Sequence, residues 1–411
     1  MIDFRGKSDV AGLYITYWSL RDPLCQTQSL AYLRELTKLG HEFALITFEQ
    51  PKYALDGEQA AAARKELAEG GIHWYPLRYH KRFSLLATGF DCLCGVVAGA
   101  RLVFRHRARV AHSRASIPAA MGLVLSRLCR IKFLYDADSA LSEEYADIGH
   151  WRRDGLAFKV TAWFESLARQ SASSVVFLTE QLRRDLSHEL NARAPVTVIP
   201  CCVDTNKFRF DAGARARRRS ELGLGDEKLF VYVGKIGSWY LIDETFEFFR
   251  TARQEIGAAR LLILTGDAPE AFHEVAERCG VGQEAYDVRH AGHDEVVEWL
   301  SASDAGLALI RQVSSKRGSS PVKVGEYLAT GLPVVITSGI GDYSALIEKE
   351  RLGAVVDSLT PAEYLESTER LLSLWAEGAS LRDRCRGAAE THASLDAVGR
   401  VRYQAVYEQL L

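Results

Sequence analysis

The stretch GSSPVKVGEYLATGLPVV, residues 318–335, has the pattern of a short helix that leads directly into an apolar strand. Ser320 is a good N-cap, and Pro321 suits the first helical position, where its missing N–H costs nothing. Gly331 is expected to end the helix in the left-handed conformation, and Pro333 prevents its continuation. A helix followed at once by an apolar strand is typical of a parallel sheet with covering helices.

The same helix carries two opposite charges one turn apart, Lys323 and Glu326. Ser319, Ser320 and the first-turn amides would form an anion site, to which Lys316 and Lys323 add full charges. A carboxylate only accepts hydrogen bonds, so Glu326 suits two neighbouring hydroxyls such as a ribose diol. Together these features predict a nucleotide diphosphate. An exposed ion pair between Lys323 and Glu326, worth roughly a few tenths of a kcal/mol, explains the spacing equally well.

Two series of short apolar runs alternate with helical patterns along the rest of the chain. The first series predicts strands at 12–17, 43–48, 72–77, 109–113, 132–136, 174–179 and 196–200. The second predicts strands at 229–234, 260–266, 286–292, 305–310, 333–338 and 353–357. We therefore predict an α/β protein with two Rossmann-like domains, residues 1–203 and 204–392, and a last helix at 393–411 that packs back toward the first domain. Because ligands of such sheets bind beyond the carboxyl ends of the strands, the cleft between two facing domains is the expected site.

The composition is that of an ordinary globular protein, with 47% hydrophobic and 25% charged residues among 411. A single core stops growing at roughly 250–300 residues, which supports two domains. The eight cysteines form neither a C-x-x-C pair nor a zinc pattern, which favours reduced thiols in a cytoplasmic protein. The N-terminal MIDFRGKSDVAG lacks the apolar core of a signal peptide. The apolar run CLCGVVAGA is shorter than the about 20 residues of a membrane span.

Positive charge is concentrated in one region of the chain. The net charge is −2, yet residues 78–132 contain eleven Lys or Arg and a single acid, Asp91. Aromatic residues are interspersed there, and such a surface suits an anionic membrane at about 1 kcal/mol per cation. No nucleic-acid-binding module is recognisable. We expect residues 78–132 to make peripheral contact with the inner face of the cytoplasmic membrane, unless they form a solvated helix face.

The stretch SSPVKVGEYLATGLPVV resembles the signature segment of glycosyltransferase family 4, the retaining GT-B enzymes. Matches to that family extend from about residue 12 to the end of the chain. DPLCQTQSLAYLRELTKLGHEFALITFE (22–49) and RVAHSRASIPAAMGLVLSRLCRIKFLYD (109–136) resemble a subgroup of bacterial polysaccharide transferases. VIPCCVDTNKF (198–208) is similar to the hinge motif, and VYVGKIGSWYLIDETFEFF (231–249) to the start of the second domain. The resemblance implies a GT-B fold whose first domain binds the acceptor and whose second binds the donor.

The activity that the resemblance implies is transfer of a hexose, with retention, from a UDP- or GDP-linked sugar. The acceptor would be a hydroxyl of a glycan or lipid-linked glycan in cell-surface polysaccharide biosynthesis, and no metal or other cofactor is expected. Asp136-Ala137-Asp138 has the letters of a metal motif, but it ends a first-domain strand, which is the wrong context. A sugar-nucleotide epimerase and a catalytically degenerate nucleotide-binding assembly subunit remain alternatives.

The resemblance also implies roles for residues of the second domain. Glu326 takes the ribose hydroxyls, and Lys235 follows Gly234 in the loop that contacts the diphosphate. Gly318 stands where the family has the acid beside the donor sugar, so the sugar is not identified. His293 would bracket the base. The complete predicted nucleotide-binding set is Glu326, Lys323, Ser319, Ser320, Lys316, Gly234 and His293.

Four residues of the first domain are further candidates. Arg114 stands where many family members have a histidine, and it either binds a phosphate or sugar oxygen or pairs with Asp136 or Asp138. Asp138 is the candidate to meet the acceptor hydroxyl. Gln26 and Gln28 either hydrogen-bond the acceptor or donor sugar or cap a helix that begins near Ser29. Gly318 is the further position expected beside the acceptor or donor sugar. The predicted catalytic residues are Arg114, Asp138 and Lys235.

Overall fold

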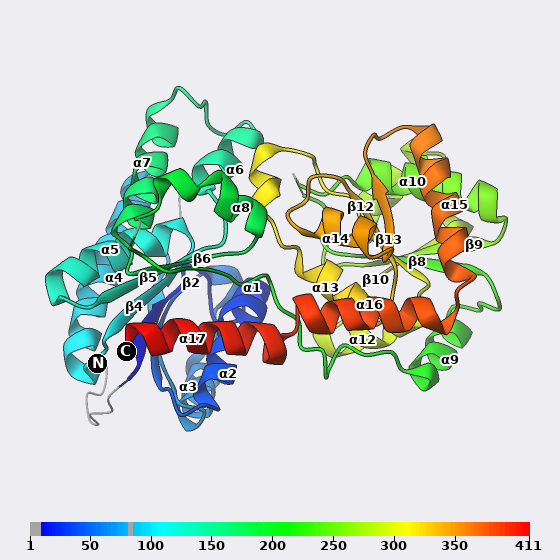
Figure 1. Ribbon diagram of the computed structural model, residues 1–411. Coiled ribbons are helices and arrows are strands. Elements are labelled where there is room, and N and C mark those ends of the chain that lie inside the picture. The colour runs from blue at the N-terminus through cyan, green and yellow to red at the C-terminus, as the bar shows by residue number, and fades with distance from the viewer. Residues whose placement is uncertain (1–9, 81–84, 192, 238) are drawn as a thin grey trace. The chain divides into compact units, whose positions relative to one another are not determined.

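The structure is a computed structural model that describes residues 10–80, 85–191, 193–237 and 239–411 (Figure 1). The chain forms two compact units, one of Met1–Pro200 with Leu395–Leu411 and one of Cys201–Ser394. These divisions fall within a few residues of those predicted after residues 203 and 392. The final helix belongs to the first unit, with which it packs.

The sheet of the first unit has seven parallel strands in the order β3-β2-β1-β4-β5-β6-β7. Each of the seven strands predicted in this half of the chain is present, within a few residues of its expected ends. Apolar β-branched and aromatic runs bounded by turn residues are therefore sufficient to locate them. Their bounds are β1 Gly12–Ile15, β2 Phe43–Glu49, β3 Ile72–Arg78, β4 Val110–Arg114, β5 Lys132–Ala137, β6 Ser174–Phe177 and β7 Val196–Val198.

Helices cover both faces of this first sheet. Leu13 and Ile15 of β1 point toward α4 and α5, whose Leu102 and Met121 share their core. Successive side chains of a strand alternate between faces, so Tyr14 points the other way. There its ring contacts His112, which in turn contacts Tyr403 and Tyr407 of α17. The helices are α1 Pro23–Cys25, α2 Ala31–Thr37, α3 Gly57–Glu69, α4 Leu85–His106, α5 Ser116–Cys129, α6 Leu141–Asp147, α7 Leu156–Ser171, α8 Glu180–Asp185 and α17 Val401–Leu410.

The sheet of the second unit has six parallel strands in the order β10-β9-β8-β11-β12-β13. All six strands predicted for it are present, as β8 Lys228–Val233, β9 Ala259–Leu264, β10 Tyr286–Arg289, β11 Ala305–Ala308, β12 Val334–Thr337 and β13 Gly353–Val356. Its helices are α9 Ala212–Glu221, α10 Ile242–Ile256, α11 Pro269–Arg278, α12 His293–Ala302, α13 Val322–Ala329, α14 Tyr343–Lys349, α15 Pro361–Trp375 and α16 Ala379–His392. Two apolar cores, one on each face, bury these strands.

The strand order of each sheet reverses beside its first strand. In the first unit β1 lies between β2 and β4, and in the second β8 lies between β9 and β11. The connections therefore leave in opposite directions at these two points, which opens a crevice at the carboxyl ends of the strands. In the second unit this crevice is bordered by the loop after β8 and by the segment between β11 and α13.

The helix α13 lies within the stretch 318–335, and one of its two predicted ends is confirmed. Gly331 has a φ of 82°, and the N–H groups of Gly331 and Leu332 donate to the carbonyls of Leu328 and Tyr327, which is a Schellman ending. The predicted start is wrong by one residue, because Pro321 is the N-cap. Ser320 does not cap the helix, since its hydroxyl accepts a hydrogen bond from the Cys201 N–H at 3.0 Å.

Tyr327 fixes α13 to the point where β8 and β11 separate. These strands pair at Phe230 and Val231. Beyond these residues, the Tyr327 hydroxyl takes the place of the direct hydrogen bonds between the two strands. It accepts from the Val233 N–H at 2.9 Å and donates to the Leu307 carbonyl at 3.4 Å. The ring lies on Gly306, where a Cβ atom would come within 2.3 Å of Tyr327 Cδ2. The helix is thus held by one side chain against both strands of the crevice.

We expect Gly306→Ala to lower the free energy of unfolding of the second unit by about 1–3 kcal/mol, because the added methyl group displaces the Tyr327 ring. Hydrogen exchange of the Val233 amide should accelerate, since its acceptor moves away. The matched control is Gly387→Ala on α16, where an added Cβ meets nothing within 4 Å. That change should be neutral or slightly stabilising. Equal losses in both variants would show that the Tyr327 contact does not hold the helix.

Candidate functional site

The most unusual group in the second unit is the buried amine of Lys323. Its Nζ lies 3.8 Å from the ring centroid of Tyr240 and 4.4 Å from that of Tyr232. Within the part of the chain that the structure describes, this nitrogen has no hydrogen-bond partner. Burial lowers the pKa of Lys323 to about 7, although the Glu326 charge acts in the opposite direction. The aromatic rings favour the cation but satisfy none of its three donors.

Gly234, at the end of β8, leaves the space that the Lys323 amine occupies. Gly234 has a φ of 151°, and a Cβ atom there would come within 2.8 Å of Lys323 Nζ. Only glycine therefore allows the amine to approach the backbone so closely. The amine lies directly beside the loop that begins at Lys235. A small anion at this position would receive the free N–H donors of the ammonium group.

Glu326 is the second buried charge, one turn farther along α13. Its side chain belongs to a residue that is 8% exposed. Burial raises the pKa of the Glu326 carboxyl to about 7, while Lys323 and Lys207 act in the opposite direction. The interpretation of Lys323 and Glu326 as an exposed ion pair is wrong, because both residues are buried. Buried charges that are not fully compensated destabilise a fold, and they concentrate at functional sites.

The loop after β8 and the segment before α13 are brought together by a second lysine. The Lys316 ammonium lies 3.7 Å from the ring centroid of Trp239. The carbonyl of Lys316 accepts from the N–H groups of Ser319 and Gly341. Lys316 and Gly318 are buried, and Ser319 is half-buried. Gly318 ends the 3-10 turn Ser314–Gly318. The predicted cluster of Lys316, Gly318, Ser319 and Lys323 is therefore close to one end of the sheet.

For two other predicted residues of this unit, no side-chain contact with the cluster is described. Lys235 is exposed, and only its carbonyl has a defined role, accepting from the Tyr232 hydroxyl at 2.8 Å. His293 begins α12, and its side chain lies outside the described residues. Their assigned roles stay predictions. The aromatic cage of Tyr232 and Tyr240 was missed in the sequence, although both residues flank Gly234 in VYVGKIGSWY.

In the first unit, Arg114 is buried in an ion pair with Asp136. Arg114 Nη1 lies 2.6 Å from Asp136 Oδ2, and both side chains are almost fully buried. The Tyr403 hydroxyl of α17 donates to the same carboxylate oxygen at 2.5 Å. The interpretation that pairs Arg114 with Asp136 is thus confirmed. The guanidinium is 2% exposed and is held by this carboxylate, which gives Arg114 a structural contact. Its catalytic role stays a prediction.

The surroundings of Asp136 keep it ionised inside the unit. Burial alone would raise its pKa, but the Arg114 guanidinium and His112 hold the pKa of Asp136 below its ordinary value. Burial lowers the pKa of His112, whose Nδ1 lies 2.8 Å from the Tyr407 hydroxyl. Tyr403 and Tyr407 therefore attach α17 to β4 and β5 through polar contacts.

Asp138 lies just after this network, and its carboxyl has a different electrostatic environment from that of Asp136. Burial raises the pKa of Asp138 to about 7, while Arg114 acts in the opposite direction. Its Oδ1 atom has no hydrogen-bond partner within the described residues. A carboxyl with a pKa near neutrality and a free oxygen can accept or donate a proton at physiological pH. The prediction that Asp138 meets an acceptor hydroxyl stays open.

Gln26 and Gln28 separate into two environments. Gln28 is buried, and its Oε1 accepts from Arg114 Nη2 at 3.3 Å. Gln26 donates to the Leu20 carbonyl at 2.7 Å. Neither caps a helix near Ser29, because the chain is already helical from Pro23, where the Asp22 side chain accepts from the Leu24 N–H.

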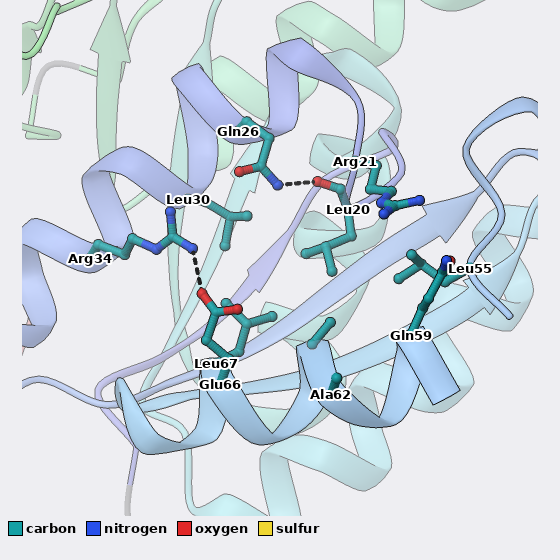
Figure 2. A pocket seen from close by; sticks show the side chains of 11 residues that line it. Leu20, Arg21, Gln26, Leu30, Arg34, Leu55, Gln59, Ala62, Glu66 and Leu67 are labelled. Carbon is teal, nitrogen blue, oxygen red and sulfur yellow. Dashed lines mark hydrogen bonds and ion pairs between the residues drawn. The ribbon is translucent and has the colours of Figure 1, made fainter. Parts of the chain in front are cut away.

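Gln26 lines a cavity of about 420 Å³. Figure 2 shows its lining between the helical segment from Pro23 to Thr37 and α3. Its base is apolar, with Leu30 and Leu67, while the Arg34–Glu66 pair lies at its edge. The cavity can hold a ligand with both apolar and hydroxyl groups.

No group of three or more His, Cys, Asp or Glu side chains that could hold a metal ion occurs among the described residues. The Asp136 carboxylate, one half of the Asp-x-Asp letters, is engaged by Arg114 and Tyr403. The expectation of a reaction without a metal cofactor stays a prediction.

Two family models match consecutive parts of the chain. The model described as a glycosyl transferase 4-like domain matches residues 25–202, and the model described as glycosyl transferases group 1 matches residues 227–374. Together they span most of both units. The chain belongs to glycosyltransferase family 4. Its two Rossmann-like units form the GT-B fold of these enzymes.

Individual relatives of this family 4 chain are distant. A GDP-mannose-dependent alpha-(1-6)-phosphatidylinositol monomannoside mannosyltransferase of Mycobacterium tuberculosis is 25% identical over 218 residues. That match covers 50% of the chain and 55% of the relative, so the chain spans about half the length of the curated relatives it matches.

Solved structures agree over the whole chain. Sucrose-phosphate synthase from Thermosynechococcus elongatus superposes with a TM-score of 0.74 at 15% identity, covering 98% of this chain and 99% of that one. HepE from Anabaena, in complex with UDP-glucose, has a TM-score of 0.70 at 12% identity, with 96% and 99% covered. At these identities the likeness shows the fold alone.

Arg114→Met in this family 4 chain should reduce stability by about 3–5 kcal/mol, because it leaves the Asp136 carboxylate buried without a counter-ion. Tyr403→Phe should cost about 1–3 kcal/mol through the same carboxylate. Thermal unfolding followed by circular dichroism measures both. Since the Asp136 pKa is lowered in the fold, its stabilising effect is lost as the pH falls toward that pKa, and Arg114→Met should remove this dependence. An Arg114→Met protein with unchanged stability would show that the ion pair with Asp136 does not hold the unit.

Proposed function

We propose that this chain is a retaining glycosyltransferase that moves a hexose from a UDP- or GDP-linked sugar to a hydroxyl of a glycan or lipid-linked glycan in cell-surface polysaccharide biosynthesis. The observation that carries the proposal is the buried Lys323 amine, which lacks a hydrogen-bond partner at the crevice of the second sheet, one turn before the buried Glu326. Related proteins support the donor class: the mycobacterial relative is named GDP-mannose-dependent, and Anabaena HepE holds UDP-glucose.

The diphosphate would lie against Lys323 and the backbone at Gly234. There it would accept from the Lys323 ammonium and lie at the start of α13, where a helix favours anions. The ribose hydroxyls would donate to the Glu326 carboxylate, as such bonds to an ionised acceptor are worth about 1.5–3 kcal/mol each. Bound phosphate supplies the counter-charge that the Lys323 ammonium lacks in the empty site, so the donor favours the protonated amine.

The reaction breaks the bond between the sugar anomeric carbon and the diphosphate oxygen. The new bond forms between that carbon and the acceptor oxygen on the same face of the sugar, and the acceptor proton passes to the departing phosphate oxygen. Negative charge increases on the leaving diphosphate in the transition state, so we propose that Lys323, Lys316 and the helix amides stabilise it. This route requires no enzymic base.

The acceptor is assigned to the first unit. Asp138 has a carboxyl oxygen without a partner, and the cavity at Gln26 combines an apolar base with polar edges. Both features suit a hydroxyl-bearing glycan with an apolar carrier. A cytoplasmic location is part of the proposal, and it is supported by the eight free cysteine thiols, since reducing compartments keep thiols free.

Isothermal titration with UDP and GDP tests the donor site. We expect Glu326→Gln to weaken nucleotide binding by about 10- to 100-fold and Lys323→Met to weaken it at least as much. The matched control is Lys228→Met on the opposite end of β8, where the ammonium lies 4.9 Å from the Trp375 ring centroid. That variant should bind normally. If wild-type protein binds neither nucleotide, the proposed function is wrong; if only Glu326→Gln binds normally, the role of Glu326 is wrong.

Glu326→Gln should also make the unliganded protein more stable above neutral pH. The folded pKa of Glu326 is raised from 4.5 to about 7, so stability falls as the pH rises through that window. The amide does not ionise and avoids this loss, which gives a gain of about 2 kcal/mol at pH 8 and little change near pH 5. Melting temperatures at both pH values measure it. A variant that is less stable at pH 8 would contradict the uncompensated carboxylate.

Transfer with retention is tested on the product. Proton NMR of the product formed from an α-linked donor should show an α-linked sugar. Release of a free sugar or an epimer without an acceptor would instead favour an epimerase, and nucleotide binding without any turnover would favour a degenerate binding subunit.

A further inference from the structure

Three helices of the first unit form one continuous layer on its sheet. α4, α5 and α7 lie side by side, with α5 in contact with the other two (Figure 1). Their inner sides bury the strands, as Leu102 of α4, Leu123 of α5 and Ala168 of α7 show. The outer side of the layer faces away from the sheet.

The outer side of this layer is apolar where a soluble helix would be polar. On α4, Leu86, Phe90, Leu93 and Val97 follow a spacing of four, three and four residues and are 86%, 51%, 60% and 42% exposed. This is the spacing of one helical face. Leu128 of α5 and Trp163 of α7 are also more than half exposed. We call these six side chains the outer apolar face.

The charges on the same three helices have one sign at the surface. Their only acids are Asp91 and Glu165, and both are buried. Asp91 is bonded to Tyr17 and His80, and Glu165 to Ser116 and Ser142. The exposed charged side chains on these three helices are cations, namely Arg101, Arg127 and Lys159. An apolar face whose own helices expose cations and no acid is complementary to an anionic bilayer.

The packing of α4 fixes one side of this helix on the protein. Residues Leu86–His106 are long and apolar enough to span a bilayer by length and composition. However, Gly95 and Gly99 bring the inner side of α4 very close to α5. A Cβ at Gly95 would lie 2.4 Å from Met121 Sδ, and one at Gly99 2.7 Å from Leu125 Cδ1. Such close packing keeps one side of α4 on the protein and leaves only the other for lipid.

We propose that the outer apolar face docks the first unit on an anionic lipid bilayer, with Leu86, Phe90, Leu93 and Trp163 among the acyl chains and Arg101 and Arg127 at the headgroups. The apolar side chains anchor the protein, and the cations select anionic lipid. This differs from the contact expected from the basic composition of residues 78–132, because the apolar contact is insensitive to salt. A lipid-linked acceptor would then meet the enzyme at the membrane surface.

Co-sedimentation with vesicles tests the proposal. Wild-type protein should bind vesicles of phosphatidylcholine with phosphatidylglycerol, retain part of that binding in high salt, and bind phosphatidylcholine alone more weakly. The double variant Leu93→Glu, Leu128→Glu should lose at least about tenfold in binding to both. Arg101→Glu with Arg127→Glu should lose only the preference for phosphatidylglycerol. Trp163 fluorescence should shift to the blue with vesicles, by comparison with Trp163→Phe.

The matched control replaces exposed leucines of the second unit, Leu365→Glu and Leu372→Glu on α15, which are 37% and 36% exposed. It should bind vesicles like wild type, and circular dichroism should show that all variants fold. Absence of binding to either vesicle, or equal losses in the control, overturns the proposal. A wild-type dimer that Leu93→Glu dissociates, without any lipid binding, would assign the face to a second copy of the chain instead. Nucleotide titrations read out the donor site separately, so the two proposals fail independently.

Discussion

The hydroxyl of Tyr327 is the contact on which the second unit's site depends. Where β8 and β11 stop pairing, this hydroxyl accepts from Val233 and donates to Leu307, so the open end of the ladder is satisfied by a side chain of α13. Gly306 leaves room for the ring. Because the helix is fixed at this point, the side chains one and four positions earlier, Glu326 and Lys323, are held in place without any contact that neutralises them.

Holding Lys323 and Glu326 in buried positions costs the fold stability. Lys323 and Glu326 are both buried, and burial moves the pKa of each toward neutrality, which means that the fold opposes their charged forms. A segment selected for stability alone would place apolar residues there. The apolar neighbours Val324 and Leu328 on the same helix show that the core accepts such side chains. Under the proposed function, the donor supplies what these two charges lack, and stability and function compete at these positions.

Patterns within short windows of the sequence predicted the features that depend on neighbouring residues. All thirteen strands, the Gly331 ending and the order of elements follow from apolar runs and turn residues within short windows. The errors concern partners that are distant in sequence. Ser320 was expected to cap α13, but it bonds Cys201. Arg114 pairs with Asp136, which was one of the two interpretations, but the contact of this pair with Tyr403, 289 residues away, was not expected. The cage of Tyr232 and Tyr240 around Lys323 depends on how the β8 loop folds back, which no periodicity reports.

The two units have the same strand order at their reversal points, yet they differ in what occupies them. In the first unit, Arg114 and Asp136 at the ends of β4 and β5 form an ion pair. The Tyr403 hydroxyl of α17, the last helix of the chain, donates a hydrogen bond to the Asp136 carboxylate. Arg114 and Asp136 are therefore each paired with an opposite charge. In the second unit the equivalent position holds the Lys323 amine without a hydrogen-bond partner. A charged ligand gains more where a charge is uncompensated, which is why we propose the second unit for the diphosphate. In the first unit the proposal assigns the acceptor to the partnerless oxygen of Asp138 and to the cavity at Gln26.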